Sequence, residues 1–219
     1  MITKDTLRFL SSLKKNNNKP WFEDNRNKYN HARENFLHFV EKLIEGIGEF
    51  DEDIAILEPR QCIFRQNRDV RFSKDKSPYK SHMGAYLNKG TKKINTPGYY
   101  VHIQPSHSLI AAGWYQPEPT VLAKIRQEID YNPDDWINVI NNKQVQKLSL
   151  KLDTSETLIR PPKNYEINNP MIEFLKLKSF VISRPASDEE VIEGKYVSET
   201  IKAFRSLKPF IDFLNRSSE

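Results

Sequence analysis

The stretch GYYVHIQPSHSLIAAGWY, residues 98–115, decides the fold of this chain. It holds two short runs, 99–104 and 109–115, that are enriched in aromatic and β-branched residues, as β-strands are. Between them lies QPSHS, whose proline and serines are typical of a turn. The stretch therefore predicts a β-hairpin.

The first run alternates between two kinds of side chain. Its apolar members, Val101 and Ile103, fall on one face. Its polar members fall on the other: Tyr100, His102 and Gln104. Because successive side chains of a strand point to opposite faces, this alternation predicts an antiparallel strand with one buried side.

Working outward from the hairpin, further strand-like runs occur at RQCIF (60–64), GAYL (84–87) and SFVIS (179–183). Helical periodicity occupies both ends of the chain, in segments that start at capping residues or prolines. In the N-terminal part these segments are 3–15, with Thr3 as cap, and Pro20 to about Gly46. In the middle of the chain they are 118–129 with Pro119, 132–140 with Asn132 and Pro133, and 168–177 with Asn169 and Pro170. Near the C-terminus, a capping box from Ser187 to Glu190 opens one helix, and residues 195–215 form another.

Helices and strands do not alternate regularly along the chain, which argues against a doubly wound α/β sheet. The pattern predicts an α+β fold, with a central, mainly antiparallel sheet packed by N- and C-terminal helices. At 219 residues we expect a single domain, 1–219.

Composition excludes several classes of protein. The single cysteine, Cys62, rules out a disulfide within the chain and a cysteine-based zinc site, and its apolar neighbours indicate a buried side chain rather than a nucleophile. No glycine-rich phosphate loop and no metal-ligand motif is present, so we expect neither a cofactor nor a metal. No apolar leader or membrane-spanning stretch is found, so the expected location is cytoplasmic, without a membrane partner.

Positive charge is concentrated in one part of the chain. The total is +5, whereas residues 60–93 contain ten lysines and arginines against two aspartates and carry +8. The remainder therefore carries −3. Such local basicity favours a site for an anion over a general nucleic-acid coat.

The candidate ligand-binding residues come from one segment of this window: Arg65, Arg68, Asp69, Arg71, Lys74, Lys76, Tyr79 and Lys80. Arginine forks suit phosphate or carboxylate oxygens, and Asp69 is placed to hold one arginine. Phe72 and Tyr79 are expected to pack the loop on the core. The competing interpretation is a structural salt-bridge network with the acidic helices.

Secondary candidates lie outside this segment or at its end: Trp21, Arg26, His82, Tyr100 and His102. Aromatic rings could stack on a base or sugar, although such rings more often serve packing. If the chain were an acid–base enzyme, His102 or His82 would be the proton-transfer group. Nothing in the sequence names a reaction, and whether the chain is an enzyme stays open.

One run, RxxRDxRFxxDKxPYKxH, resembles the signature of the domain of unknown function 2461 family. Its residues are Arg65, Arg68, Asp69, Arg71, Phe72, Asp75, Lys76, Pro78, Tyr79, Lys80 and His82. Three other stretches are similar to that family as well: FLSSLKKNNNKPWFEDNRNKY, GYYVHIQPSHSLIAAGWYQPEPTVLAKIR and PPKNYEINNPMIEFLKLKSF. The resemblance covers about residues 5–215. It implies membership of a bacterial and fungal family but brings no mechanism.

Three functions remain in contention. The leading hypothesis is a site for a phosphorylated or otherwise anionic small molecule. The alternatives are a nucleic-acid-binding module that uses the same basic segment, and a protein-interaction domain that docks an acidic partner. The sequence does not determine the oligomeric state.

Overall fold

The hairpin at 98–115 forms as predicted and lies within a five-stranded antiparallel sheet. We describe residues 1–91 and 93–217 of a computed structural model, so Lys92 of the basic window lies outside the described residues. The strand order is β1-β2-β3-β5-β4. The strands are β1 (Met83–Asn88), β2 (Gly98–Ile103), β3 (Ser108–Trp114), β4 (Lys151–Leu152) and β5 (Phe180–Ala186).

Helices precede, interrupt and follow the strands, which confirms the α+β prediction. Those before the sheet are α1 (Lys4–Lys15), α2 (Lys19–Asp24), α3 (Arg26–Gly48), α4 (Glu52–Ala55) and α5 (Pro59–Cys62). Those after β3 are α6 (Pro119–Tyr131), α7 (Pro133–Ile140), α8 (Lys143–Lys147), α9 (Ile172–Leu175), α10 (Asp188–Ile192) and α11 (Tyr196–Arg216). None of the described helices is both long and apolar enough to cross a membrane.

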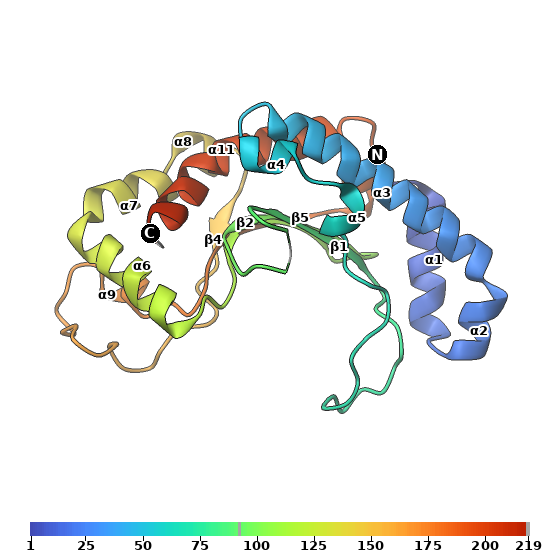
Figure 1. Ribbon diagram of the computed structural model, residues 1–219, viewed down its shortest axis with the longest axis horizontal. Coiled ribbons are helices and arrows are strands. Elements are labelled where there is room, and N and C mark those ends of the chain that lie inside the picture. The colour runs from blue at the N-terminus through green and yellow to red at the C-terminus, as the bar shows by residue number, and fades with distance from the viewer. Residues whose placement is uncertain (92, 218–219) are drawn as a thin grey trace.

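Helices cover one face of the sheet. Helices α3, α4 and α11 run along that face, while α1 and α2 lie beyond one end of the sheet and α6, α7 and α9 beyond the other (Figure 1). On this side Tyr99, Val101 and Ile103 are fully buried, and the ring of Tyr99 lies 5.1 Å from that of Phe204 in α11. The alternation predicted for β2 is therefore confirmed, and Tyr100 and His102 belong to the opposite, uncovered face.

The local signals at helix starts were mostly correct. The side chain of Thr3 accepts a hydrogen bond from the Thr6 backbone, and the capping box between Ser187 and Glu190 is present. Asn132 takes the cap position of α7, but its side chain donates to Glu128 instead of capping the helix. Such caps satisfy backbone donors that have no partner within the helix.

Three element predictions were wrong. Residues 60–64 are not a strand: Pro59–Cys62 is a turn of helix, and Ile63 makes only an isolated bridge to Ala85. The helix expected from Pro20 to Gly46 is divided at Asn25 into α2 and α3. Asn169 accepts a hydrogen bond from Met171 in a turn, so α9 starts later, at Ile172.

Candidate functional site

Residues 64–82, which we term the basic arm, leave the uncovered side of the sheet and return to β1 (Figure 1). Backbone hydrogen bonds join the two halves of the arm, from Lys80 to Gln66 at 2.8 Å and from Arg68 to Pro78 at 2.9 Å. The Gln66 side chain is buried and donates to the backbone carbonyls of Lys80 and His82. The arm is thus an irregular hairpin with a fixed base.

The N-terminal helices hold the arm through Tyr79. Asn17 donates to the Tyr79 carbonyl at 2.8 Å and accepts from its amide at 3.0 Å. The Tyr79 ring is buried and stacks on Phe22 of α2 at 3.9 Å. Tyr79 therefore packs the arm on the core, as its sequence position suggested.

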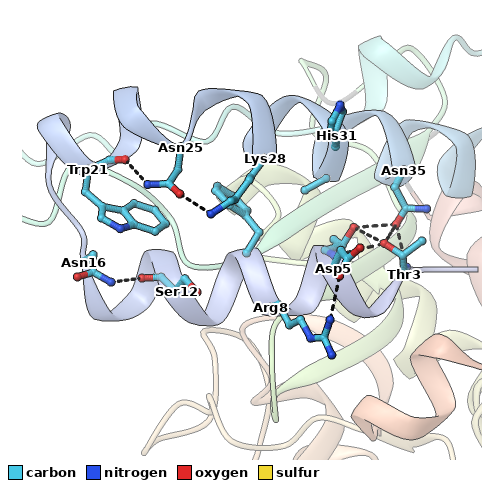
Figure 2. Close-up of a pocket in the computed structure, with 13 residues that line it drawn as sticks. Thr3, Asp5, Arg8, Ser12, Asn16, Trp21, Asn25, Lys28, His31 and Asn35 are labelled. Atoms are coloured by element: carbon cyan, nitrogen blue, oxygen red, sulfur yellow. Dashed lines mark hydrogen bonds and ion pairs between the residues drawn. The ribbon is translucent and has the colours of Figure 1, made fainter.

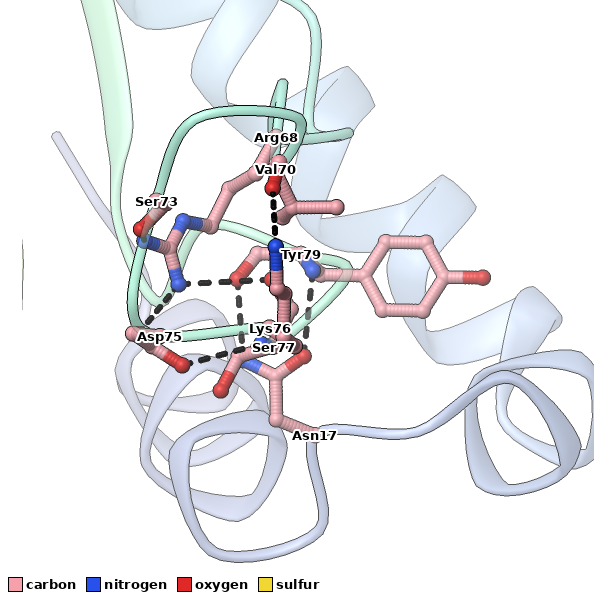
Figure 3. A network of polar contacts seen from close by, with 8 residues as sticks. All are labelled: Asn17, Arg68, Val70, Ser73, Asp75, Lys76, Ser77 and Tyr79. Atoms are coloured by element: carbon pink, nitrogen blue, oxygen red, sulfur yellow. Dashed lines mark hydrogen bonds and ion pairs between the residues drawn. The ribbon is translucent and has the colours of Figure 1, made fainter.

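Arg68 is committed to contacts inside the arm (Figure 3). Its guanidinium forms an ion pair with Asp75 and donates at 3.3 Å to the Ser77 carbonyl and to the Ser73 hydroxyl. Hydrogen bonds from Ser77, together with the Arg68 guanidinium, lower the pKa of Asp75 to about 2. This network holds the arm in its hairpin shape.

The other cations of the arm are bound to groups of the arm or are exposed. Asp69 accepts hydrogen bonds from Arg71, among them one from Nε at 3.0 Å and one from Nη2 at 2.6 Å. Lys76 donates to the Val70 carbonyl at 3.0 Å, and Arg65 and Lys74 are exposed. Arg68 and Arg71 are therefore each paired with a different aspartate of the arm.

Phe72 differs most from expectation. It does not pack the arm on the core, because 96% of its surface is exposed. The Arg71 guanidinium carbon lies 5.8 Å from the centre of its ring.

A hollow of about 550 Å³ lies on the uncovered face of the sheet, at the foot of the arm. Small residues form much of its floor, namely Gly98, Ala111, Ala112, Gly113 and Ser183. Aromatic rings line it, from Phe64, Tyr86, Tyr100 and Tyr115. Its polar or charged members are Lys80, His82, Asn95 and Asp153. We refer to it as the sheet hollow.

A chain of polar contacts runs along the open face of β2. The Tyr100 hydroxyl lies 2.9 Å from His102 Nδ1, and His102 Nε2 lies 2.9 Å from Gln104 Oε1. An amide oxygen only accepts, so Nε2 carries the imidazole proton and Nδ1 accepts from the Tyr100 hydroxyl. The tyrosine oxygen then keeps its lone pairs for a donor in the hollow.

The imidazole rings of His82 and His102 stack on each other, with their centres 4.3 Å apart. Burial lowers the pKa of His82 to about 4, and the nearby charges of His102, Lys80 and Arg68 add to the effect. Burial also lowers the pKa of His102 and raises that of Tyr100 to about 12. All three groups are therefore neutral near pH 7.

The low pKa of His82 predicts an acid-sensitive fold. The unfolded chain protonates His82 near pH 6.5, whereas the folded chain does so only near pH 4. The free energy of unfolding therefore has its full value above pH 6.5 and falls as the pH drops from 6.5 to about 4. We expect a loss of about 2 kcal/mol, because the partly exposed ring keeps some hydration.

Urea unfolding between pH 7 and pH 4 measures this loss. His82→Gln keeps a polar side chain but cannot titrate, so its stability should fall less over the same range. Equal losses in the two proteins would show that His82 does not carry the effect.

Trp21 and Arg26 lie outside the sheet hollow. Trp21 lines a larger space of about 710 Å³ between α1 and α3 (Figure 2). Its ring stacks on that of Phe9. Many polar groups there bond to one another: Asn35 accepts from Thr3, for example, and Lys28 donates to Asn25. Arg26 pairs with Glu23 and lines another depression, beside Tyr79.

Of the residues predicted from the sequence, the structure brings four together at or beside the sheet hollow: Lys80, His82, Tyr100 and His102. The sequence prediction missed Phe64, Tyr86, Asp153 and Ser183. Tyr86 could have been found, because alternation along β1 places it on the face opposite to Ala85 and Leu87, which are fully buried. Cys62 is fully buried, and the described residues contain no group of three or more potential metal ligands.

Comparison with known proteins gives a family match. A family model described as "Conserved hypothetical protein (DUF2461)" matches residues 5–213. The match covers almost the whole chain and confirms the resemblance found in the sequence. No curated protein and no solved structure matches the chain.

Proposed function

This chain belongs to the DUF2461 family, and we propose that it binds an anionic small molecule in the sheet hollow. The observation that carries this proposal is the hollow itself, an aromatic-lined depression of about 550 Å³ with Lys80 and His82 on one side. Ligand sites are typically concave and mostly apolar, with a few polar groups that fix orientation. The proposal names a ligand class and no reaction.

The basic and acidic groups of the hollow lie on opposite sides of it. Lys80 and His82 precede β1 at one edge of the sheet, and Asp153 follows β4 at the opposite edge. Asp153 would repel a second anionic group and favour a hydrogen-bond donor. The ligand we infer is therefore anionic at one end and carries hydroxyl or amino groups at the other.

The size of the sheet restricts the ligand further. Four strand spacings separate β1 from β4, or roughly 19 Å. Free phosphate is too short to contact both sides. A nucleotide or a sugar phosphate has the required length once the reach of the Lys80 and Asp153 side chains is counted. The neutral oxygen of Tyr100 lies between these sides and accepts from a ligand hydroxyl.

The basic arm supplies a field that favours an anion. Residues 65–80 contain six lysines and arginines and two aspartates, a net charge of +4. Arg68 and Lys80 are close enough to His82 to lower its pKa. The same positive potential raises the local concentration of an anion.

Melting temperatures against a panel of anions test the proposal. The panel contains phosphate, nucleoside monophosphates, sugar phosphates and dicarboxylic acids at constant ionic strength. A ligand at 100 times its dissociation constant stabilises the folded state by about 2.7 kcal/mol, which raises the melting temperature by several degrees. We expect selective shifts from nucleotides or sugar phosphates.

Two charge-matched variants complete the design. Lys80→Gln removes the cation of the sheet hollow and should abolish the selective shift. Lys202→Gln removes an exposed lysine of α11, on the helical layer, and should leave the shift unchanged. Equal responses in the two variants, or a panel without any selective shift, would contradict the proposal.

A further inference from the structure

The exposed ring of Phe72 has no role in the folded core. Burying a phenylalanine side chain stabilises a fold, and this ring forgoes that contribution because 96% of its surface is exposed. Tyr79, in the same arm, is only 7% exposed. The chain therefore buries one aromatic ring of the arm and presents another to solvent.

Arg71 is held beside this ring. Asp69 fixes its guanidinium with contacts of 3.0 Å and 2.6 Å, and the guanidinium carbon lies 5.8 Å from the ring centre of Phe72. A held guanidinium next to an aromatic face offers a charge and a stacking surface side by side. Single exposed apolar residues are common on proteins, so the argument rests on this pairing and on the charge around it.

The arm remains strongly positive after its internal ion pairs are counted. Asp69 and Asp75 each neutralise one arginine, and the net charge of residues 65–80 is still +4. Arg65 and Lys74 are exposed on either side of Phe72 in the sequence. A partner with spaced negative charges complements this surface.

We propose that the outer part of the arm binds single-stranded nucleic acid, with a base stacked on Phe72 and phosphates against Arg65, Arg71 and Lys74. Basic side chains interleaved with aromatic rings are the usual means of binding single strands, because every base has a face that can stack. In a duplex those faces are covered by neighbouring bases. An acidic peptide would satisfy the charges but leave the ring unused. This surface is separate from the sheet hollow.

Fluorescence anisotropy of a labelled oligodeoxythymidylate, about 12 nucleotides long, measures the interaction. Phe72→Ala and Phe72→Leu should each weaken binding about tenfold, since stacking of one base is lost. Phe72→Trp, which stacks as well or better, should retain full affinity. Ile159→Ala removes a side chain that is 98% exposed elsewhere and should change nothing.

The dependence on salt gives a second readout. Neutralising about three phosphates predicts a slope of roughly −2 for log K against log salt, and Lys74→Gln should reduce its magnitude by about 0.7. Duplex DNA of the same sequence should bind more weakly. Each variant should melt as the wild type does, because Phe72 and Lys74 are exposed.

Several outcomes would overturn the inference. Absence of oligonucleotide binding at low salt does so directly. Undiminished binding by Phe72→Leu would show that the ring is not a stacking surface. If the protein bound phosphatidylserine vesicles more tightly than the oligonucleotide, and Phe72→Leu kept that binding, the outer part of the arm would be a membrane contact. Lys80→Gln and the anion panel report on the sheet hollow independently, so a failure of either proposal can be told from a failure of the other.

Discussion

Replacing Gly113 with alanine is expected to lower the free energy of unfolding by about 3 kcal/mol or more. Gly113 has a φ of +136°, a conformation that other residues rarely adopt. An added Cβ would lie 2.0 Å from the Phe180 carbonyl oxygen and 2.9 Å from the Val181 Cα. These are backbone atoms of the neighbouring strand β5, so relief requires opening the pairing of β3 with β5.

Gly194→Ala is the matched control, because its added Cβ would meet nothing within 4 Å. It should be neutral or slightly stabilising, since alanine restricts the unfolded chain. Urea unfolding of both variants measures the difference. A Gly113→Ala protein within about 0.5 kcal/mol of wild type would mean that the β3–β5 backbone does not have the described register.

The second large effect concerns ligand binding. Ala111 lies on the uncovered face of β3, opposite Tyr100 on one side and Ser183 on the other. Ala111→Trp should fill the sheet hollow and occupy the space that the ligand needs. The affinity for the anion of the panel that binds best should therefore fall at least about a hundredfold. The indole enters open space rather than a packed core, so overpacking strain is small.

Ala111→Ser controls for substitution at the same position, because it adds one small polar atom and leaves the space open. Isothermal titration calorimetry of both variants against the ligand found with the panel gives the affinities. Undiminished affinity in Ala111→Trp would place the ligand elsewhere on the molecule.

The central strands were predictable from local pattern. Alternation in 99–104 assigns Tyr100 and His102 to the uncovered face, and this assignment depends only on the two-residue period of a strand. Capping at Thr3 and Ser187 was equally local. These signals were enough to obtain the fold class and part of one wall of the hollow.

The rest of the hollow depends on pairing across distant segments. Ser183 joins the floor because β5 pairs with β3, and Asp153 joins the edge because it follows β4, which pairs with β5. No periodicity reveals which strands become neighbours, so these residues could not be assigned. The 60–64 run shows the opposite error, since its apolar residues suit a strand but Glu58 and Gln61 form a capping box for α5.

Within the basic arm, composition identified the charge but not its partners. The alternative to a ligand site was a salt-bridge network with the acidic helices, whereas Arg68 pairs with Asp75, seven residues away in the same arm. Phe72 was expected to pack on the core because phenylalanines usually do. Its exposure follows from the arm leaving the body of the protein, a tertiary feature without a local signal.

The most direct test of anion binding in the sheet hollow is an NMR titration of the histidine side chains. An anion beside His82 stabilises its charged form, so the pKa of His82, about 4 in the free protein, should rise with saturating ligand. Resonances of His31 and His38, on α3, serve as internal controls. At each pH they should have the same positions with and without the ligand. An identical His82 titration with and without the ligand would contradict binding in the hollow.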